Sequence, residues 1–191
     1  MSVFKIRCGL PLVAMFLLST VIVVASTIQK PPAPVSEGVN VKARPQAIWL
    51  SILEARTADP GLTSCKMLSE NGRRSVLKET FMVPVLGDVG CTLSLLDSPP
   101  NRMDYKLINS DTFTTFDGSW VMTPGANEHS TRLVLSCDAV PKRAVPPFFL
   151  HMVIDRKVKK RLDFVKTLAE RKEIQMQTVA LGLGQQQPSS R

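Results

Sequence analysis

The sequence predicts an α+β domain in which an antiparallel β-sheet packs against one long C-terminal helix. From Ser64 to Pro141, apolar and polar residues alternate with a period of two, and turn-forming residues interrupt the alternation at short intervals. From Pro146 to Ile174, apolar residues recur every three or four positions and form one long stripe. Consecutive strands joined by short turns make an antiparallel meander with one apolar face, and the terminal helix is the partner for that face.

The residues before this domain have the pattern of an export signal or of a membrane anchor. Lys5 and Arg7 precede the segment from Leu10 to Ile28, which contains no charged side chain. This order is typical of a secretory signal, with cleavage after Ala25 as one outcome. The same run is long enough to cross a bilayer, which takes ~20 residues. Residues 1–28 are therefore predicted to be a signal peptide or a membrane anchor, and both alternatives place the rest of the chain outside the cytoplasm.

Two further segments flank the predicted domain. Residues 29–38 are rich in proline and predict a stiff, extended linker. Residues 177–191 end in a run of Gly, Gln, Pro and Ser, a composition typical of disorder. The folded domain is therefore expected to span residues 39–176.

The domain is expected to begin with a short strand and a helix. Residues alternate from Val39 to Ala43 as in a strand. A helix then starts at Pro45, where the missing N–H of proline costs little. Apolar residues at helical spacing, among them Ile48 and Ile52, predict one buried face. The sequence Asp-Pro-Gly at 59–61 has strong turn chemistry and ends the helix.

Five or six strand candidates follow, separated by turn signals of hairpin or short-loop length. The strand candidates are Cys65–Ser69, Ser75–Val83, Gly90–Leu96, Met103–Ser110, Ser119–Thr123 and Thr131–Val140. The turn signals are Asn71-Gly72, Leu86-Gly87-Asp88, Ser98-Pro99-Pro100-Asn101, Asp117-Gly118 and Pro124-Gly125-Ala126-Asn127. In the last candidate, Leu133, Leu135 and Cys137 share one face, so the sheet is expected to have one apolar side and one wet side.

The C-terminal helix combines its apolar stripe with a basic surface. The stripe consists of Ile154, Val158, Leu162, Val165 and Ala169. At 1.5 Å per residue the helix reaches on the order of 40 Å, enough to lie across a small sheet. The basic cluster from Arg156 to Arg161 is expected to be a solvated helix face. Beside a bilayer, such a cluster would also attract anionic head groups at ~1 kcal/mol per charge.

Cysteines and charge exclude several classes of partner. Without Cys8, three cysteines remain at 65, 91 and 137 with no C-x-x-C spacing, so a metal site is not expected. One disulfide with one free thiol, or three buried thiols, are both open. The formal net charge of +8 attracts polyanions. Aromatic residues make up only 6% and are not interleaved with basic stretches, which argues against a base-stacking surface and a nucleic-acid partner.

The sequence contains no arrangement of residues that predicts a reaction. Among its two histidines, His129 lies in a predicted turn, and His151 stands near the start of the long helix without an acid partner close in sequence. Tyr105 alternates with apolar neighbours and would place a hydroxyl on the inner face or at its rim. G-x-S-x-G, H-E-x-x-H, P-loop and Rossmann motifs are absent, so we expect no cofactor.

The order of short strand, helix, meander and long helix resembles the START-like, or Bet v 1-like (SRPBCC), superfamily. The residues from Phe116 to Trp120, followed by a hairpin and Thr131-Arg132-Leu133, look like the penultimate strand pair of that family. The residues from Pro141 to Pro146 look like its entry into the final helix. The resemblance is nearest the polyketide cyclase/dehydrase and coenzyme Q-binding group. It implies a helix-grip fold, in which a curved antiparallel sheet wraps around the C-terminal helix and leaves a cavity.

An apolar cavity of this kind binds apolar ligands. We therefore expect non-catalytic binding or transport of an apolar small molecule, such as a lipid, a quinone or a polyketide-like compound. The alternatives are a cyclase/dehydrase-like enzyme on the same fold and an interaction module whose core is filled. A membrane surface is expected as a second partner, through the N-terminal segment and the basic helix face. The residues expected to face the ligand, each with core packing as its other role, are Leu93, Leu95, Met103, Tyr105, Leu107, Trp120, Met122, Leu133, Leu135, Phe149, Met152 and Val153.

Overall fold

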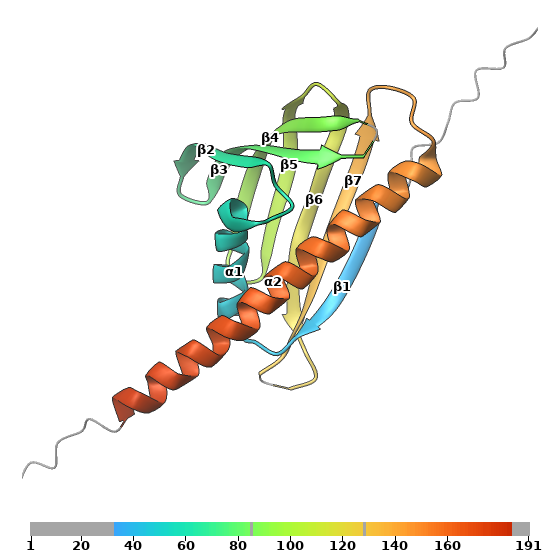
Figure 1. The fold of residues 1–191 in the computed structure, drawn as a ribbon. Coiled ribbons are helices and arrows are strands. Elements are labelled where there is room, and N and C mark those ends of the chain that lie inside the picture. The colour runs from blue at the N-terminus through green and yellow to red at the C-terminus, as the bar shows by residue number, and fades with distance from the viewer. Residues whose placement is uncertain (1–32, 85, 128, 185–191) are drawn as a thin grey trace, which may run out of the picture. The chain divides into compact units, whose positions relative to one another are not determined.

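A computed structural model describes residues 33–84, 86–127 and 129–184, with side chains as far as residue 180. Within these residues, the strand β1 (Val35–Val41) and the helix α1 (Pro45–Ala58) precede a run of strands, and the helix α2 (Pro147–Gly184) follows it. The strands of that run are β2 (Ser64–Asn71), β3 (Arg74–Val83), β4 (Gly87–Ser98), β5 (Arg102–Ser110), β6 (Phe113–Pro124) and β7 (Thr131–Pro141). Figure 1 shows these elements in chain order.

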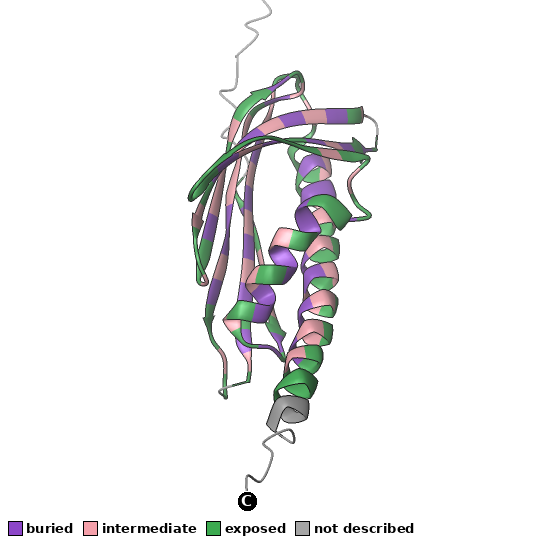
Figure 2. Cartoon of the chain, turned by 90° about the vertical axis from the view of Figure 1, so that its left-hand side faces the viewer, coloured by how far each residue is buried: buried purple, intermediate pink, exposed green. Residues whose placement is uncertain are grey.

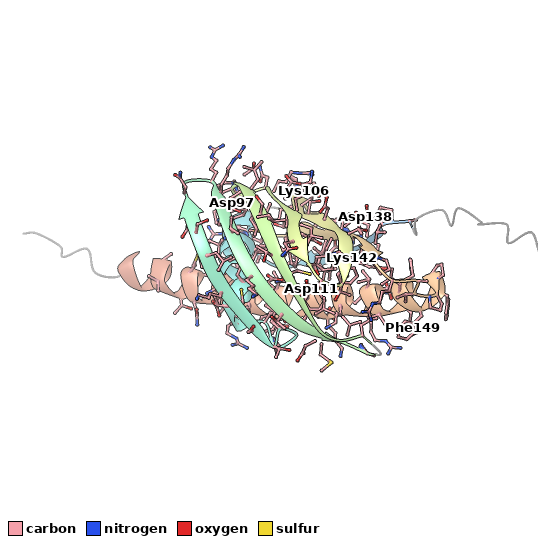
Figure 3. All side chains as sticks on the ribbon, turned by 90° about the horizontal axis from the view of Figure 1, so that it is seen from above. Asp97, Lys106, Asp111, Asp138, Lys142 and Phe149 are labelled. Carbon is pink, nitrogen blue, oxygen red and sulfur yellow. The ribbon has the colours of Figure 1, made fainter. Side chains whose placement is uncertain are left out.

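The strands form a single antiparallel sheet in the order β1-β7-β6-β5-β4-β3-β2. The strands from β2 to β7 are a meander, and β1 closes one edge by pairing with the last strand of that meander. Both helices lie on the same side of the curved sheet (Figure 2), and α2 crosses the strands obliquely (Figures 1 and 3). The predicted α+β helix-grip architecture is therefore confirmed.

The core lies where the apolar stripe of α2 meets the sheet. The five predicted stripe residues, from Ile154 to Ala169, are each at most 5% exposed. Opposite them, Leu133, Leu135 and Cys137 are buried on one face of β7, as the alternation predicted. Helix α2 packs mainly on β1, β7 and α1. It therefore covers the half of the sheet that contains β1 and β7, and the strands farther from that edge curve past the helix.

Ion pairs attach the helices to their neighbours. The guanidinium of Arg56 on α1 lies 2.7 Å from Asp97 of β4 and is buried against it. Arg44, just before α1, pairs at 2.8 Å with Glu173, whose side chain is only 3% exposed on α2. The Arg56 pair is largely buried on both sides, so leaving either of its charges alone would be costly, whereas Arg44 is partly exposed. The two pairs hold α1 between the sheet and α2.

The strand β6 is longer than predicted, because Asp117-Gly118 is not a turn. The strand runs from Phe113 to Pro124, and Gly118 pairs with Cys137 on one side and with Tyr105 on the other. Pairing between β5 and β6 ends at this point, and an Asp117 carboxylate oxygen accepts the backbone N–H of Leu107 at 2.8 Å. Asp117 and Gly118 therefore mark the point where β5 and β6 stop pairing with each other. The chain does not reverse its direction there, although both residues favour turns.

Both ends of the domain differ from the predicted boundaries. Strand β1 begins at Val35, so residues 35–38 belong to the sheet and not to the linker. Helix α2 continues to Gly184, so residues 177–184 are helical and not a disordered tail. The amide of Gln177 donates to Glu173 one turn earlier, at 3.1 Å, and the Gln, Ala and Leu residues of this stretch are good helix formers. The predicted signal or anchor at 1–28 and residues 185–191 lie outside the described residues.

Candidate functional site

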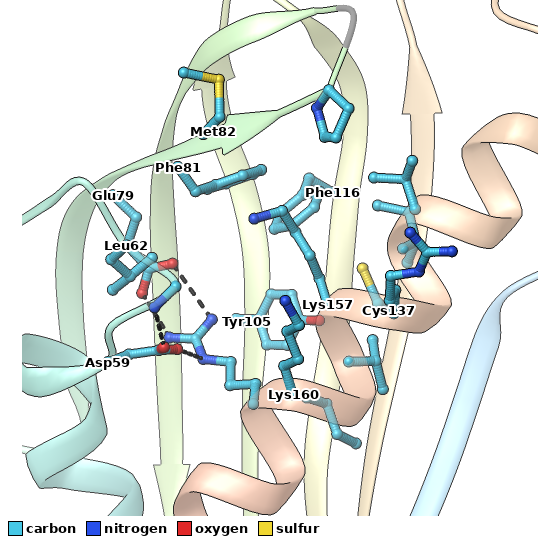
Figure 4. A pocket seen from close by; sticks show the side chains of 18 residues that line it. Asp59, Leu62, Glu79, Phe81, Met82, Tyr105, Phe116, Cys137, Lys157 and Lys160 are labelled. Atoms are coloured by element: carbon cyan, nitrogen blue, oxygen red, sulfur yellow. Dashed lines mark hydrogen bonds and ion pairs between the residues drawn. The ribbon is translucent and has the colours of Figure 1, made fainter.

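A cavity of about 360 Å³ lies between the sheet and the N-terminal half of α2 (Figure 4). Its walls come from the loop after α1, from strands β3, β5, β6 and β7, and from α2. Most of the lining is apolar and includes Leu62, Phe81, Phe116, Leu135, Val153 and Val158. The cavity lies where the sheet curves past α2, because a straight helix cannot fill the concave side of a bent sheet.

Aromatic rings from three strands form one wall of the cavity. The rings of Phe81 on β3 and Phe116 on β6 are stacked, with centroids 5.5 Å apart. Tyr105 on β5 lies 6.2 Å from Phe116 in a tilted arrangement. Aromatic contacts of this geometry add to the stability that burial alone supplies. The wall is thus a preformed apolar surface.

A charged cluster lies at the inner end of the cavity. Arg161 reaches from α2 to Glu79 on β3, with Nη2 and Oε1 3.2 Å apart, and its Nε lies 3.1 Å from Oδ2 of Asp59 (Figure 4). The side chains of Glu79 and Asp59 are only 3% and 8% exposed. Burial by itself would lower the pKa of Arg161, but the two carboxylates raise it above its ordinary value. The cluster therefore holds one cation between two anions.

The hydroxyl group of Tyr105 is a fixed hydrogen-bond donor. It donates to the backbone carbonyl of Ser136 at 2.8 Å. Burial raises the pKa of Tyr105 well above its usual value, so the hydroxyl stays protonated near neutral pH. The phenol passes directly over Gly118, where a β-carbon would overlap both the hydroxyl and the Ser136 carbonyl. Because Gly118 has no side chain, the Tyr105 ring can lie across β6 and form part of the cavity wall.

Solved structures share this architecture. The Zhui aromatase/cyclase from Streptomyces sp. R1128 is 21% identical over 73% of this chain and 94% of its own, with a TM-score of 0.66. A START superfamily protein from Mycobacterium smegmatis is 19% identical over 75% of this chain and 98% of its own, with a TM-score of 0.59. A STAR-related lipid transfer protein from Xanthomonas axonopodis is 11% identical over 74% of this chain and 89% of its own, with a TM-score of 0.60. The chain has the START-like, Bet v 1-like (SRPBCC) fold.

At these identities the likeness to solved structures shows the START-like fold alone. The sequence matches no family model, and no curated protein matches it. The predicted nearness to the coenzyme Q-binding group therefore stays a prediction.

The structure brings together some of the residues that were predicted to face a ligand. Tyr105, Leu135 and Val153 line the main cavity of the START-like domain. Leu93, Leu95, Met103 and Trp120, again with Tyr105, line a much smaller void of about 30 Å³ farther along the sheet. The remaining five, which line neither space, are Leu107, Met122, Leu133, Phe149 and Met152. Of these, Met122 and Leu133 are buried in the core, and contact of any of the twelve with a ligand stays a prediction.

The charged cluster was not predicted from the sequence. The expectation that Arg161 belongs to a solvated basic face is wrong, because Arg161 points inward to Glu79 and Asp59. A signal was present in the helical spacing: Arg161 follows Val158 by three positions and precedes Val165 by four, and therefore lies on the apolar stripe. Glu79 likewise occupies an inward position of its strand. Each charge stands on the apolar face of its own element, which is unusual unless a partner is near.

Other polar residues lie away from this site or cannot ionise easily. His129 and His151 are both exposed, and neither lines the main cavity. Within the described ranges, no three His, Cys, Asp or Glu side chains gather into a group that could hold a metal ion. The described cysteines Cys65, Cys91 and Cys137 are all free, and the last two are buried. Cys137 lines the cavity, and burial raises its pKa to about 11.

We expect Cys137 to resist alkylation in the native protein. At pH 8 only about one Cys137 thiol in a thousand would be a thiolate, the reactive form. Cys65 is more exposed, although burial raises its pKa as well. Iodoacetamide followed by peptide mass spectrometry should therefore label Cys65 first, and Cys91 and Cys137 only after unfolding in urea, which serves as the control. Labelling of native Cys137 at the rate of Cys65 would contradict the burial described above.

Proposed function

We propose that this START-like domain binds an apolar small molecule without transforming it, in the cavity between the sheet and α2. The observation that carries the proposal is the cavity itself, whose volume of about 360 Å³ falls in the ~300–1,000 Å³ range of small-molecule sites. Aliphatic and aromatic side chains form most of its walls. Unfilled apolar space lowers stability, so an apolar occupant would be favoured by the contacts that it restores.

The polar groups of the cavity support binding rather than a reaction. The guanidinium of Arg161 is engaged by two carboxylates, the Tyr105 hydroxyl is protonated and bonded to the backbone, and the Cys137 thiol is protonated near neutral pH. Among the described lining residues these groups offer neither an activated nucleophile nor a free general base. The similar structures include both an aromatase/cyclase and a lipid transfer protein, so the shared fold is compatible with either use.

The two alternatives make different predictions. A cyclase/dehydrase-like enzyme would turn over a candidate polyketide-like substrate, whereas a binding protein would release the substrate unchanged. An interaction module with a filled core would have no space for a ligand, and the main cavity argues against that reading.

Filling the cavity is expected to abolish binding while the fold is retained. Val153 lines the cavity from α2, and Val153→Phe would place a ring in the space that a ligand needs. We expect the affinity for the neutral apolar probe N-phenyl-1-naphthylamine to fall roughly tenfold or more. The matched control is Ile108→Phe, at an exposed β5 position that does not line the cavity. Fluorescence titration measures both.

Native mass spectrometry of protein purified without denaturant provides the second readout. We expect a stoichiometric apolar molecule on the wild-type domain and on Ile108→Phe, and much less of it on Val153→Phe. The proposal fails if the wild type neither retains such a molecule nor binds the neutral probe. It fails equally if Val153→Phe binds the probe as the wild type does.

We further propose that the domain works outside the cytoplasm and beside a membrane. The support is the charge-free segment from Leu10 to Ile28 behind Lys5 and Arg7, together with the exposed basic residues Arg156 and Lys160 on α2. No helix within residues 33–84, 86–127 or 129–184 is long and apolar enough to span a bilayer.

A further inference from the structure

Among the residues that the structure describes, the inner end of the cavity carries no cation that is available to a ligand. The guanidinium of Arg161 lies within 3.2 Å of both Glu79 and Asp59. One positive and two negative charges leave the cluster with a net charge of −1. An anionic group that approached it would meet charges of its own sign in a poorly solvated place, where such repulsion is strong. The interior therefore disfavours an anion.

The mouth of the cavity has the opposite character. Arg156, Lys157 and Lys160 line it, and Arg156 and Lys160 are exposed. None of the three forms an ion pair with another described residue, whereas Lys159, on the same turns of α2, pairs with Asp155 and Glu37. The acids among the described lining residues are Asp59 and Glu79, both held by Arg161. Helix α2 therefore places three cations at the mouth that have no ion-pair partner among the described residues.

Lys157 is the rim residue nearest the apolar wall. Its ammonium lies 5.4 Å from the centre of the Phe81 ring, in a cation–π arrangement. Burial lowers the pKa of Lys157, because water no longer fully solvates the ammonium. An anion placed at the mouth would stabilise this charge, whereas a neutral or cationic group would not.

The cavity has a defined inner limit. Glu79, Arg161, Tyr105 and Phe116 line both the main cavity and the void of about 30 Å³ beyond it. The ion pair between α2 and β3 thus stands between the two spaces. A molecule that enters at the mouth has an apolar path that ends at this pair, so its apolar end goes in first.

From these observations we infer that the ligand is a single-chain amphiphile with an anionic head group. The chain lies along the aromatic wall, and the head stays at the mouth near Arg156, Lys157 and Lys160. The inference rests on the proposed function and adds the charge and the orientation of the ligand.

Three probes with the same ten-carbon chain test the head group: decanoate, decanol and decylammonium. Displacement of N-phenyl-1-naphthylamine at pH 7.5 and low ionic strength gives their affinities. We expect decanoate to bind roughly three- to tenfold more tightly than decanol, as one or two favourable exposed charge contacts would produce. Decylammonium should bind more weakly than decanol. The advantage of decanoate should shrink when ionic strength rises from about 0.02 M to about 0.3 M.

A pair of variants locates the head group. Arg156→Gln with Lys160→Gln removes two rim charges and should reduce the affinity for decanoate about threefold or more, with decanol unaffected. The control Lys166→Gln with Arg171→Gln makes the same change in net charge on α2 at positions that do not line the cavity. It should leave the affinity for decanoate within about twofold of the wild type, because neither residue lines the cavity and so neither can contact the head group.

Each outcome distinguishes the inference from the proposed function. Equal affinities for the three probes, or tightest binding of decylammonium, would overturn the inference and leave the proposed function standing. Equal losses in the rim variant and in its control would also overturn it. If neither the three probes nor the neutral naphthylamine binds, the proposed function itself fails.

Discussion

Replacing Arg161 with methionine is expected to lower the free energy of unfolding by about 2–4 kcal/mol. The change leaves Glu79 and Asp59 buried without their counter-charge, and removal of one partner from a buried ion pair typically costs about 3–5 kcal/mol. The lower figure allows for the Arg161 side chain, which is 26% exposed, so that water can partly replace it. Urea unfolding followed by circular dichroism measures the loss.

A second substitution separates the charge effect from lost packing. Glu79→Gln added to Arg161→Met removes one of the two stranded carboxylates, and we expect it to restore about 1 kcal/mol or more. Arg171→Gln, at an exposed position of the same helix, should change stability by no more than about 0.5 kcal/mol. If Arg161→Met were as stable as the wild type, Glu79 and Asp59 would have to be hydrated. The ion pairs of the charged cluster would then contribute nothing to the free energy of unfolding.

Gly118→Ala is expected to destabilise the domain by about 3 kcal/mol or more, or to prevent folding. A β-carbon at this position would overlap the backbone carbonyl of Ser136 and the phenol of Tyr105. The carbonyl belongs to β7, which pairs with β6 on both sides of this point, so it cannot move alone. Overpacking in a closed site typically costs about 1–3 kcal/mol and occasionally more. Thermal and urea unfolding measure the effect.

Gly90→Ala is the matched control for this substitution. Gly90 also lies within a strand, but a β-carbon there would have no atom within 4 Å. We expect its stability to remain within about 1 kcal/mol of the wild type. If Gly90→Ala and Gly118→Ala behaved alike, the close passage of Tyr105 over β6 would not be what requires glycine at position 118.

Much of the architecture could be predicted, because periodicity encodes which side of an element is buried. The alternation around Leu133 and Leu135 identified the inner face of β7, and the spacing from Ile154 to Ala169 identified the packed face of α2. Turn chemistry was less reliable. Asp117-Gly118 has the residues of a hairpin turn, but their neighbours on β5 and β7 decide that the strand continues.

The site could be predicted only in part, since its location depends on where the helix leaves the sheet. The expected ligand residues were spread along the inner face of the sheet, from Leu93 to Leu135, and onto the start of the long helix. Periodicity cannot show which of the sheet residues α2 covers. Helix α2 packs on β1 and β7, so Leu133 is core, whereas the cavity opens toward Phe81 and Phe116. Arg161 and Glu79 each lie on the apolar face of an element, which could have singled them out, but nothing local to either element shows that they meet.

The pairing of β1 with β7 has a consequence for the order of biosynthesis. The side chains of Ser36 and Ser136 meet at 2.9 Å although they are 100 residues apart in the sequence. Contacts of such separation form late, because the intervening chain must first be made and then brought back. A nascent chain therefore keeps its first strand unpaired until nearly the whole meander has been synthesised.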